Sequence, residues 1–390
     1  MSNIPKLRFP EFTDAWEKCK LGEVAEFING KAYKQEELLN EGKYKVVRVG
    51  NFNTNEHWYY SNLELENNKY MVAGDLLYLW ATDFGPKFWA GEKAIFHYHI
   101  WKLELNYKII DKNYLYVWLE TDKEKIKQST NGTTMVHVTK STMEKRVLSF
   151  PTLPEQQKIG TLFRRLDRLI TLHKRKWDDV ILLKRALLQK MFPKNGSDFP
   201  EIRFPEFTDA WEKCKLGEIA TINPKSTLPQ TFNYVDLESV VGTEMRSYKI
   251  EKLYSAPSRA QRLAKYGDIF YQTVRPYQKN NYLFELDDEN YVFSTGYAQI
   301  RSKIYPYFLF TLIQNDRFVN EVLDNCTGTS YPAINATDLK NITIFISNNP
   351  IEQQKIGNLF KQLDRLITLH KRQHEHYQLL KKALLQQMFV

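Results

Sequence analysis

The chain has 390 residues, of which 43% are hydrophobic, and a formal net charge of +9 at pH 7. This length and apolar content are sufficient for two or three domains with cores of their own. No apolar run approaches the ~18 residues of a membrane-spanning helix, and the N-terminus does not have the pattern of a signal segment, so we expect a cytoplasmic protein. Its three cysteines, Cys19, Cys214 and Cys326, are too widely spaced to predict a disulfide framework or a clustered metal site.

Two segments of the sequence are repeated, and they divide the chain into halves. The first, RFPEFTDAWEKCKLGE, fills residues 8–23 and recurs unchanged at 203–218; we call it the head motif. The second lies at 155–191 and 352–388, where EQQKIG and LDRLITLHKR are identical at a shift of 197 residues. Repeats of this quality predict two similar halves, each with a head motif, an insert of its own and a closing helix.

These repeats also give the predicted boundaries. We expect the head motif with the first insert, the first repeat helix, a turn-rich linker with the second head motif, the second insert and the second repeat helix. In that order they cover residues 1–154, 155–191, 192–218, 219–351 and 352–390.

Both inserts show the same order of predicted elements. Alternating apolar residues in the first predict strands at Tyr44–Val49, Asp75–Trp80 and Ala94–Leu105, then a helix at Asn113–Gln128, a turn at 131–134 and a strand at Val147–Phe150. The second gives strands at Ile269–Val274, Tyr282–Leu286 and Tyr297–Ser302, a helix at Pro306–Leu323, a turn at 327–330 and a strand at Ile342–Ile346. The inserts are therefore predicted to share one α+β fold with different loops.

The two repeat helices carry an apolar stripe over about five heptads, which is typical of a helix that pairs along its length. The other copy is the obvious partner, and the short linker requires the two helices to run antiparallel. We expect a two-helix coiled coil of roughly 55 Å, at ~1.5 Å per residue, and a pseudo-two-fold molecule. The predicted core residues are Ile159, Leu162, Leu166, Leu169, His173, Val180 and Leu183, with Ile356, Leu359, Leu363, Leu366, His370, Tyr377 and Leu380.

Two histidines, His173 and His370, fall on this stripe. A metal or pH-sensing site is one interpretation of them. The favoured one is that they are polar core residues that fix the register of the coiled coil.

The positive charge is concentrated in the repeat helices. The first has ten Lys and Arg against four acids, the second seven against three, while residues 24–154 have 17 basic and 16 acidic residues and 219–351 have 13 of each. Net charge is therefore only a weak indication of nucleic-acid binding, because a solvated coiled-coil face explains most of it.

Taken together, the tandem inserts, the paired EQQKIG and LDRLITLHKR helices, the closing ALLQKMF and ALLQQMF, and the WEKCKLGE of each head motif resemble the specificity (S) subunits of type I restriction-modification systems. The resemblance covers the whole chain, and it departs only where Ile351 stands between Pro350 and Glu352. It implies two similar target recognition domains separated by a long antiparallel two-helix coiled coil.

The resemblance also implies a function without catalysis. Each insert would read one half of a bipartite, asymmetric site in double-stranded DNA, while the helices set the gap and dock two methyltransferase (M) subunits. Restriction (R) subunits would join them, and S-adenosylmethionine, ATP and Mg²⁺ would be held by these partners.

The residues themselves agree with a chain that has no chemistry of its own. No Gly-rich cofactor loop with an Asn/Asp-Pro-Pro-aromatic element occurs, and no GxxxxGK[ST] loop occurs. The acids at 285–289 are interpreted as a solvated turn rather than a metal site. Composition alone leaves one alternative open, a tandem adaptor whose inserts bind proteins or sugars.

DNA reading requires polar and aromatic side chains on loops, and both inserts have them at matching places. We predict contacts from Lys87, Thr133, Thr134, His137 and Lys140 in the first insert, and from Arg275, Tyr277, Lys279, Asn280, Thr329, Ser330 and Tyr331 in the second. Because the inserts are nearly neutral, we expect the isolated chain to bind DNA weakly.

Overall fold

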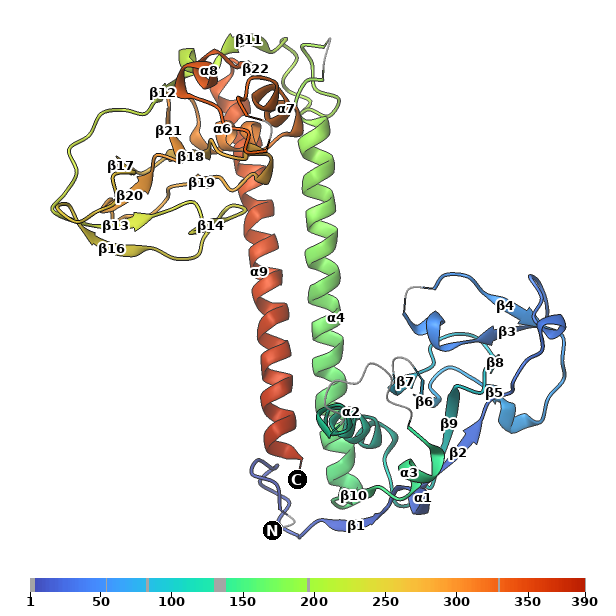
Figure 1. Cartoon of the computed structure of the whole chain (residues 1–390). Helices are drawn as coiled ribbons and strands as arrows, with labels where there is room; N and C mark the ends of the chain where they lie inside the picture. The colour runs from blue at the N-terminus through green and yellow to red at the C-terminus, as the bar shows by residue number, and fades with distance from the viewer. Residues whose placement is uncertain are drawn as a thin grey trace. The chain divides into compact units, whose positions relative to one another are not determined.

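Two long helices organise the fold, each running from one compact unit into the other. The computed structural model describes residues 4–53, 55–81, 84–129, 138–194, 197–328 and 330–389, and these divide into unit 1 (residues 1–173 with 372–390) and unit 2 (174–371). Helix α4 spans Leu153–Lys190 and helix α9 spans Pro350–Met388 (Figure 1). Helix α9 begins at Pro350, and α4 begins at Leu153, one residue before Pro154. Both helices therefore begin just before the repeated EQQKIG segment, as the repeat predicts.

In its described part, the first insert has two four-stranded sheets, ordered β2-β9-β6-β7 and β4-β3-β8-β5. All pairs are antiparallel except β3 with β8, which is parallel. The strands are β2 (Ala25–Asn29), β3 (Tyr44–Val47), β4 (Tyr59–Ser61), β5 (Tyr70–Met71), β6 (Leu76–Leu79), β7 (Gly85–Phe88), β8 (Ala94–Phe96) and β9 (Ile100–Leu105). The helices are α1 (Leu21–Val24), α2 (Lys112–Ser129) and α3 (Lys140–Glu144), with 3-10 turns at Gln35–Glu37, Val49–Phe52 and Asn67–Lys69.

The second insert repeats this topology over its described residues, with sheets β12-β21-β18-β19 and β16-β13-β20-β17 and again one parallel pair, β13 with β20. One hairpin, β14–β15, has no counterpart among the described strands of the first insert. The strands are β12 (Ala220–Ile222), β13 (Thr231–Val235), β14 (Val240–Val241), β15 (Glu244–Met245), β16 (Lys249–Lys252), β17 (Ala260–Leu263), β18 (Asp268–Gln272), β19 (Tyr282–Leu283), β20 (Tyr291–Ser294) and β21 (Tyr297–Ser302). The helices are α5 (Leu216–Ile219), α6 (Pro306–Ile313), α7 (Asp316–Asp324) and α8 (Ala336–Asn341), with a 3-10 turn at Pro276–Gln278. The predicted α+β fold, common to both inserts, is confirmed.

Two predicted elements are wrong because each contains a break. The helix expected at Pro306–Leu323 is two helices, since Asn315 leaves helical geometry and its side chain caps α7 by accepting from Arg317 N. The strand expected at Ala94–Leu105 is β8 and β9, joined through residues 97–99. The turn expected at 131–134 lies outside the described residues.

The head motif contributes a strand that its polar sequence did not predict. Strand β1 (Glu17–Lys20) pairs antiparallel with β10 (Val147–Phe150) at the end of the first insert, and β11 (Glu212–Lys215) pairs with β22 (Thr343–Ile346) in the same way. Each insert is thus closed by a ladder between its first and last segments, which places the start of the following helix next to the head motif.

A buried ion pair fastens each head motif to its helix. Arg8 donates two hydrogen bonds of 2.7 Å to Glu155 in the first turn of α4, and Arg203 donates bonds of 2.7 and 2.9 Å to Glu352 in α9. Both glutamates are fully buried. The Arg of each RFPEF segment therefore binds the Glu of each EQQ segment, and the same contact forms in both units.

The glycine of each EQQKIG segment allows the helix to pack closely on its insert. A Cβ on Gly160 would stand 2.7 Å from Asn113 Cβ and 2.8 Å from Tyr114 N, and one on Gly357 would stand 2.9 Å from Phe308 N. Contacts this short with backbone atoms leave no room for a larger residue. The cores of both units accordingly extend from the sheets along about the first four turns of α4 and α9, to Leu166 and Leu363.

The two long helices pair antiparallel within each unit, as expected. In unit 1 Asp167 of α4 binds Lys381 of α9 at 2.5 Å, and in unit 2 Lys184 binds Asp364 at 2.5 Å. A step of 17 residues up α4, from 167 to 184, thus matches a step of 17 residues down α9, from 381 to 364. One register therefore holds in both units.

The core stripe of these helices differs in part from the prediction. Ile159 and Leu166 are buried, as are Ile356 and Leu363, but Leu183, Leu366 and Leu380 are 49%, 41% and 36% exposed and do not belong to the core. The predicted Leu162 and Leu359 are partly buried against the cores, but the fully buried second line lies four residues after the first rather than three and begins with Phe163 and Phe360. His173 lies in the paired face and stacks on Tyr377 with ring centroids 5.5 Å apart.

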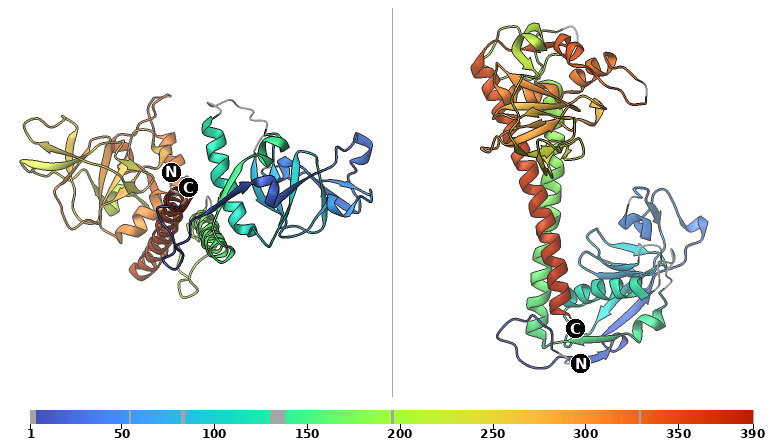
Figure 2. Two further views of the ribbon diagram at one scale, coloured as in Figure 1. Left: turned by 90° about the horizontal axis from the view of Figure 1, so that it is seen from below. Right: turned by 60° about the vertical axis from the view of Figure 1, so that its left-hand side comes forward.

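The end of each long helix fills the core of the unit that it reaches. Phe192, just after α4, packs on Trp211 and Phe308, and Phe389, just after α9, packs on Trp16 and Tyr114. Accordingly, the N- and C-terminal segments lie together in unit 1 (Figure 2). The repeated Met-Phe that ends ALLQKMF and ALLQQMF is therefore an anchor between the end of one helix and the head motif that adjoins it.

Candidate nucleic-acid interface

The loop between β18 and β19 in unit 2 is held in a strained conformation. Arg275 and Lys279, which flank the 3-10 turn Pro276–Gln278, have φ of 55° and 53°, in the left-handed region that non-glycine residues rarely adopt. Such residues persist only where the surroundings impose the conformation, and they cluster at functional sites. The loop is therefore a rigid projection.

Two buried side-chain amides hold the loop in that conformation. Gln272 is 3% exposed, and its side chain donates to Val274 O (2.7 Å) and to Gln278 Oε1 (2.8 Å). The fully buried Asn281 accepts from Gln272 N at 2.8 Å, which fastens the other end of the loop. Both ends of the loop are thus fixed to β18.

The second predicted loop of unit 2 lies against the first. Arg275 N donates to Pro332 O at 2.8 Å, Ile334 N donates to Thr273 O at 3.1 Å, and the Arg275 guanidinium lies 4.3 Å above the ring of Tyr331. Tyr277 and Tyr331 are 50% and 64% exposed, and Ser330 is exposed as well. Two segments more than fifty residues apart therefore present one surface, with Thr329 outside the described residues.

Two other candidates in unit 2 are engaged within the fold. Lys279 Nζ donates to Gln314 O at 2.9 Å and to the Asp316 carboxylate at 2.5 Å, and Asn280 Oδ1 accepts from Gly242 N at 2.8 Å. Their side chains brace the loop against α7 and the β14–β15 hairpin.

The first insert gives a less complete site. Thr133, Thr134 and His137 lie outside the described residues. Lys87 is half-buried on β7, and Lys140 in α3 donates to Phe27 O at 2.7 Å. The structure therefore does not gather the described candidates of this insert into one surface.

Aromatic rings gather instead where β8 passes into β9 in unit 1. His97 stacks on Tyr33 at 6.4 Å and lies 4.9 Å from His99, while Trp80 Nε1 donates to Tyr98 O at 2.8 Å. Burial, with His99 nearby, lowers the pKa of His97 to about 4, so this ring is neutral at pH 7. The sequence His97-Tyr98-His99 was the available signal for this cluster. The alternation of residues placed both histidines on a predicted strand, whereas in the structure they lie in the connection between β8 and β9.

A family model described as the type I restriction modification DNA specificity domain matches the chain twice, at residues 13–182 and 208–376. The chain belongs to this family. Each match covers most of one head motif, one insert and most of one long helix, so the family unit corresponds to the sequence repeat. As members of this family, specificity subunits are non-catalytic DNA-recognition subunits, and this chain is one of them.

Individual specificity subunits resemble the chain over its full length. The MjaVIII specificity subunit of Methanocaldococcus jannaschii is 26% identical over 97% of this chain and 92% of its own, and the putative MjaX subunit of the same organism is 22% identical over 98% and 95%. The crystal structure of the type I S subunit from M. genitalium has the same fold, with a TM-score of 0.69 at 16% identity over 99% of both chains.

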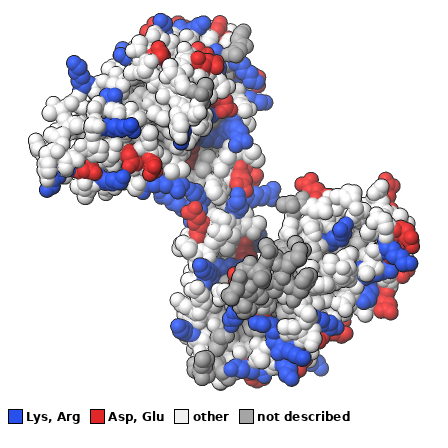
Figure 3. Space-filling model, in the orientation of Figure 1, with Lys and Arg blue, Asp and Glu red and all other residues white. Residues whose placement is uncertain are grey.

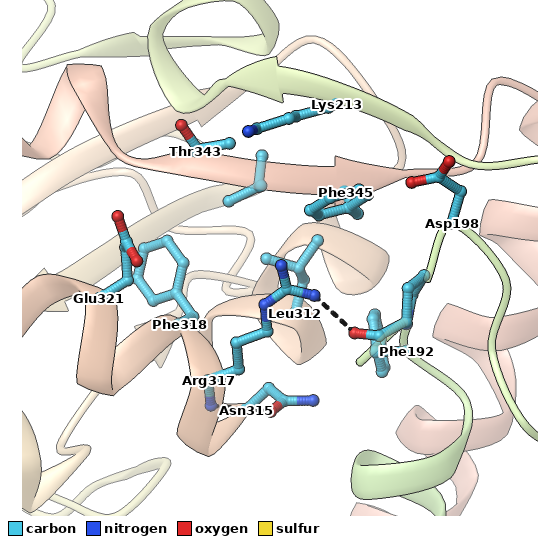
Figure 4. A pocket seen from close by; sticks show the side chains of 12 residues that line it. Phe192, Asp198, Lys213, Leu312, Asn315, Arg317, Phe318, Glu321, Thr343 and Phe345 are labelled. Carbon is cyan, nitrogen blue, oxygen red and sulfur yellow. Dashed lines mark hydrogen bonds between the residues drawn. The ribbon is translucent and has the colours of Figure 1, made fainter. Parts of the chain in front are cut away.

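Unit 2 also has a cavity of about 540 Å³, whose lining includes none of the predicted DNA contacts (Figure 4). Arg317 extends into it over the ring of Phe345, 4.6 Å away, and donates to Pro193 O at 2.7 Å. Its charged groups balance, with Lys213 and Arg317 against Asp198 and Glu321. The cavity therefore marks where the linker after α4 is seated on α7 and β22.

The surface charge agrees with the mixed composition of the inserts. Lys and Arg are interspersed with Asp and Glu over the visible face of both units (Figure 3). Within the described parts of the chain, no three His, Cys, Asp or Glu side chains are placed to hold a metal ion. None of the described helices is long and apolar enough to cross a membrane.

Proposed function

We propose that this chain reads a bipartite, asymmetric DNA sequence for a type I restriction-modification complex, each insert recognising one half-site. The observation that carries the proposal is the contrast between the repeated segments, which form a frame that is the same in both units, and the inserts, whose loops differ. The head motifs, ion pairs and helix ends are the same in both units, whereas the loops differ in sequence. A constant frame that presents two different surfaces suits the reading of two different half-sites.

Partners supply the chemistry in this proposal. Two M subunits would transfer methyl groups from S-adenosylmethionine, and R subunits would use ATP and Mg²⁺ to cleave DNA. Because the inserts are nearly neutral, phosphate attraction by this chain alone is weak. The assembled complex would therefore hold DNA much more tightly than the chain does.

The test is methylome sequencing of cells that express the chain with its M subunits, against cells that lack the chain. We expect one methylated motif made of two defined halves and a fixed gap. If the assembled complex produces no split motif, the proposal is wrong and the adaptor alternative, in which the inserts bind proteins or sugars, gains support.

Exposed leucines on the long helices support the docking of two M subunits. Leu182 and Leu183 on α4, in unit 2, are 60% and 49% exposed, and the residues 197 positions on, Leu379 and Leu380 on α9, in unit 1, are 68% and 36% exposed. Two equivalent apolar stripes provide two equivalent seats.

Introducing a charge at both seats is expected to prevent assembly. Burial of a leucine stabilises an interface by ~1.5–3 kcal/mol, so Leu182→Glu with Leu379→Glu should weaken M binding by more than about tenfold per seat. Size-exclusion chromatography with light scattering measures the stoichiometry. Leu253→Glu, at a 39% exposed leucine of the second insert, is the control and should keep two M subunits. Normal assembly of the double variant would place the seats elsewhere.

A further inference from the structure

The guanidinium of Arg275 differs in its contacts from those of Arg203, Arg301 and Arg317 in unit 2. Arg203 binds Glu352, Arg301 binds Asp268, and Arg317 donates to Pro193 O. Among the described residues, no carboxylate or carbonyl accepts a hydrogen bond from the side chain of Arg275, whose contact is with the ring of Tyr331. Its side-chain donors are therefore available to a ligand.

The backbone and the ring fix the direction of these donors. The left-handed conformation of Arg275 is unfavourable for a residue with a side chain, and the bonds from Arg275 N to Pro332 O and from Gln278 N to Arg275 O maintain it. The Arg275 guanidinium lies 4.3 Å over the Tyr331 ring in a cation–π contact, an interaction that does not use its N–H groups as hydrogen-bond donors to an oxygen. The fork is thus oriented before DNA binds.

A planar fork with free in-plane donors matches one base edge best. Guanine presents two acceptors, O6 and N7, in the major groove, and a bidentate contact from arginine is the commonest specific one. A carboxylate beside the fork would compete with the base. Asp316, the carboxylate that contacts this loop at Lys279, is engaged with that lysine.

We propose that Arg275 reads a guanine in the half-site bound by the second insert, with Tyr331 as the residue that positions it. This rests on the proposed function, and it adds that the second half-site contains a G·C pair specified by this loop. Lysine is a poor replacement for arginine here, because its ammonium is a compact point charge without the planar fork that both stacks on the ring of Tyr331 and meets O6 and N7 with parallel N–H groups.

The experiment is methylome sequencing of the complete complex with Arg275→Lys, Arg275→Ala and Tyr331→Phe. For both Arg275 variants we expect one G·C position of the second half-site to become degenerate, with discrimination falling roughly 5- to 150-fold, while the first half-site keeps its sequence. Tyr331→Phe retains the ring and should retain the motif. Lys252→Ala, which removes an exposed lysine lying 6.0 Å over the Tyr254 ring, is the charge-matched control and should leave the motif unchanged.

Two results would overturn the inference. An unchanged motif in both Arg275 variants means that the residue does not read a base. Methylation weakened equally at all sites, with the motif intact and with Lys restoring what Ala loses, means that Arg275 binds a phosphate. Both differ from failure of the proposed function, in which the unaltered chain would give no split motif.

Discussion

Replacing Arg203 by alanine is expected to lower the free energy of unfolding of unit 2 by about 3–5 kcal/mol, the usual loss when one partner of a buried ion pair is removed. Glu352 is fully buried and receives two bonds from Arg203, so the variant leaves a carboxylate without its cation in the first turn of α9. Chemical denaturation followed by circular dichroism measures the change. The substitution also removes the buried contact between the head motif and the helix.

The neighbouring pair Lys355–Glu206 is the control for this variant. It joins the same two segments, but its side chains are 47% and 43% exposed, so Lys355→Ala should cost no more than ~1 kcal/mol. Arg8→Ala should repeat the large effect in unit 1, where Glu155 is equally buried. A loss for Arg203→Ala as small as that for Lys355→Ala would mean that water reaches Glu352 and that the head motif is not an essential clamp.

The architecture could be predicted well from the segments of the sequence that are repeated. The starts of α4 and α9, their antiparallel pairing and the shared order of strands were all predictable, because helix signals and alternation are local. The strand in each head motif was not, since Glu-Lys-Cys-Lys has no apolar alternation and its partner lies about 130 residues away.

The misplaced core line of the helices has a similar cause. Near the start of α4 both Leu162 and Phe163, and later both Leu169 and Ile170, are apolar, so the sequence permits a spacing of three or of four residues. Only the direction of approach of the partner helix selects between them. Farther along the unselected line Leu183 and Leu380 are exposed, where the proposed M subunits would cover them.

The sequence predicted which loops form the surface that contains Arg275 and Tyr331, but it did not predict which side chains of those loops face outward. Equivalent positions in the two inserts identified the segments that contain Arg275 and Tyr331. Nothing local showed that Lys279 would turn inward to Asp316, because that contact depends on the break between α6 and α7. Side-chain direction in a loop follows from tertiary contacts, which is why Lys279 and Arg275 look alike in sequence and differ in the fold.

Removing one heptad from each long helix is expected to shorten the gap between the half-sites without changing either half-site. The register that matches 167 with 381 and 184 with 364 also matches 174–180 with 368–374, so deleting both segments keeps the remaining pairs aligned. Seven residues are close to two turns, so the paired faces stay nearly in phase. At 1.5 Å per residue the helices lose ~10 Å, about three base pairs of DNA at ~3.4 Å each.

Methylome sequencing of the assembled complex measures this gap directly. Deletion of 174–180 alone is the matched control, because it shifts α4 against α9 by seven residues, separates Lys184 from Asp364 and should abolish assembly. Loss of assembly in the double deletion as well would mean that the M subunits grip the helices at one fixed separation. A change in the bases of either half-site would contradict the division of labour, because it would show that the helices take part in reading as well as in spacing.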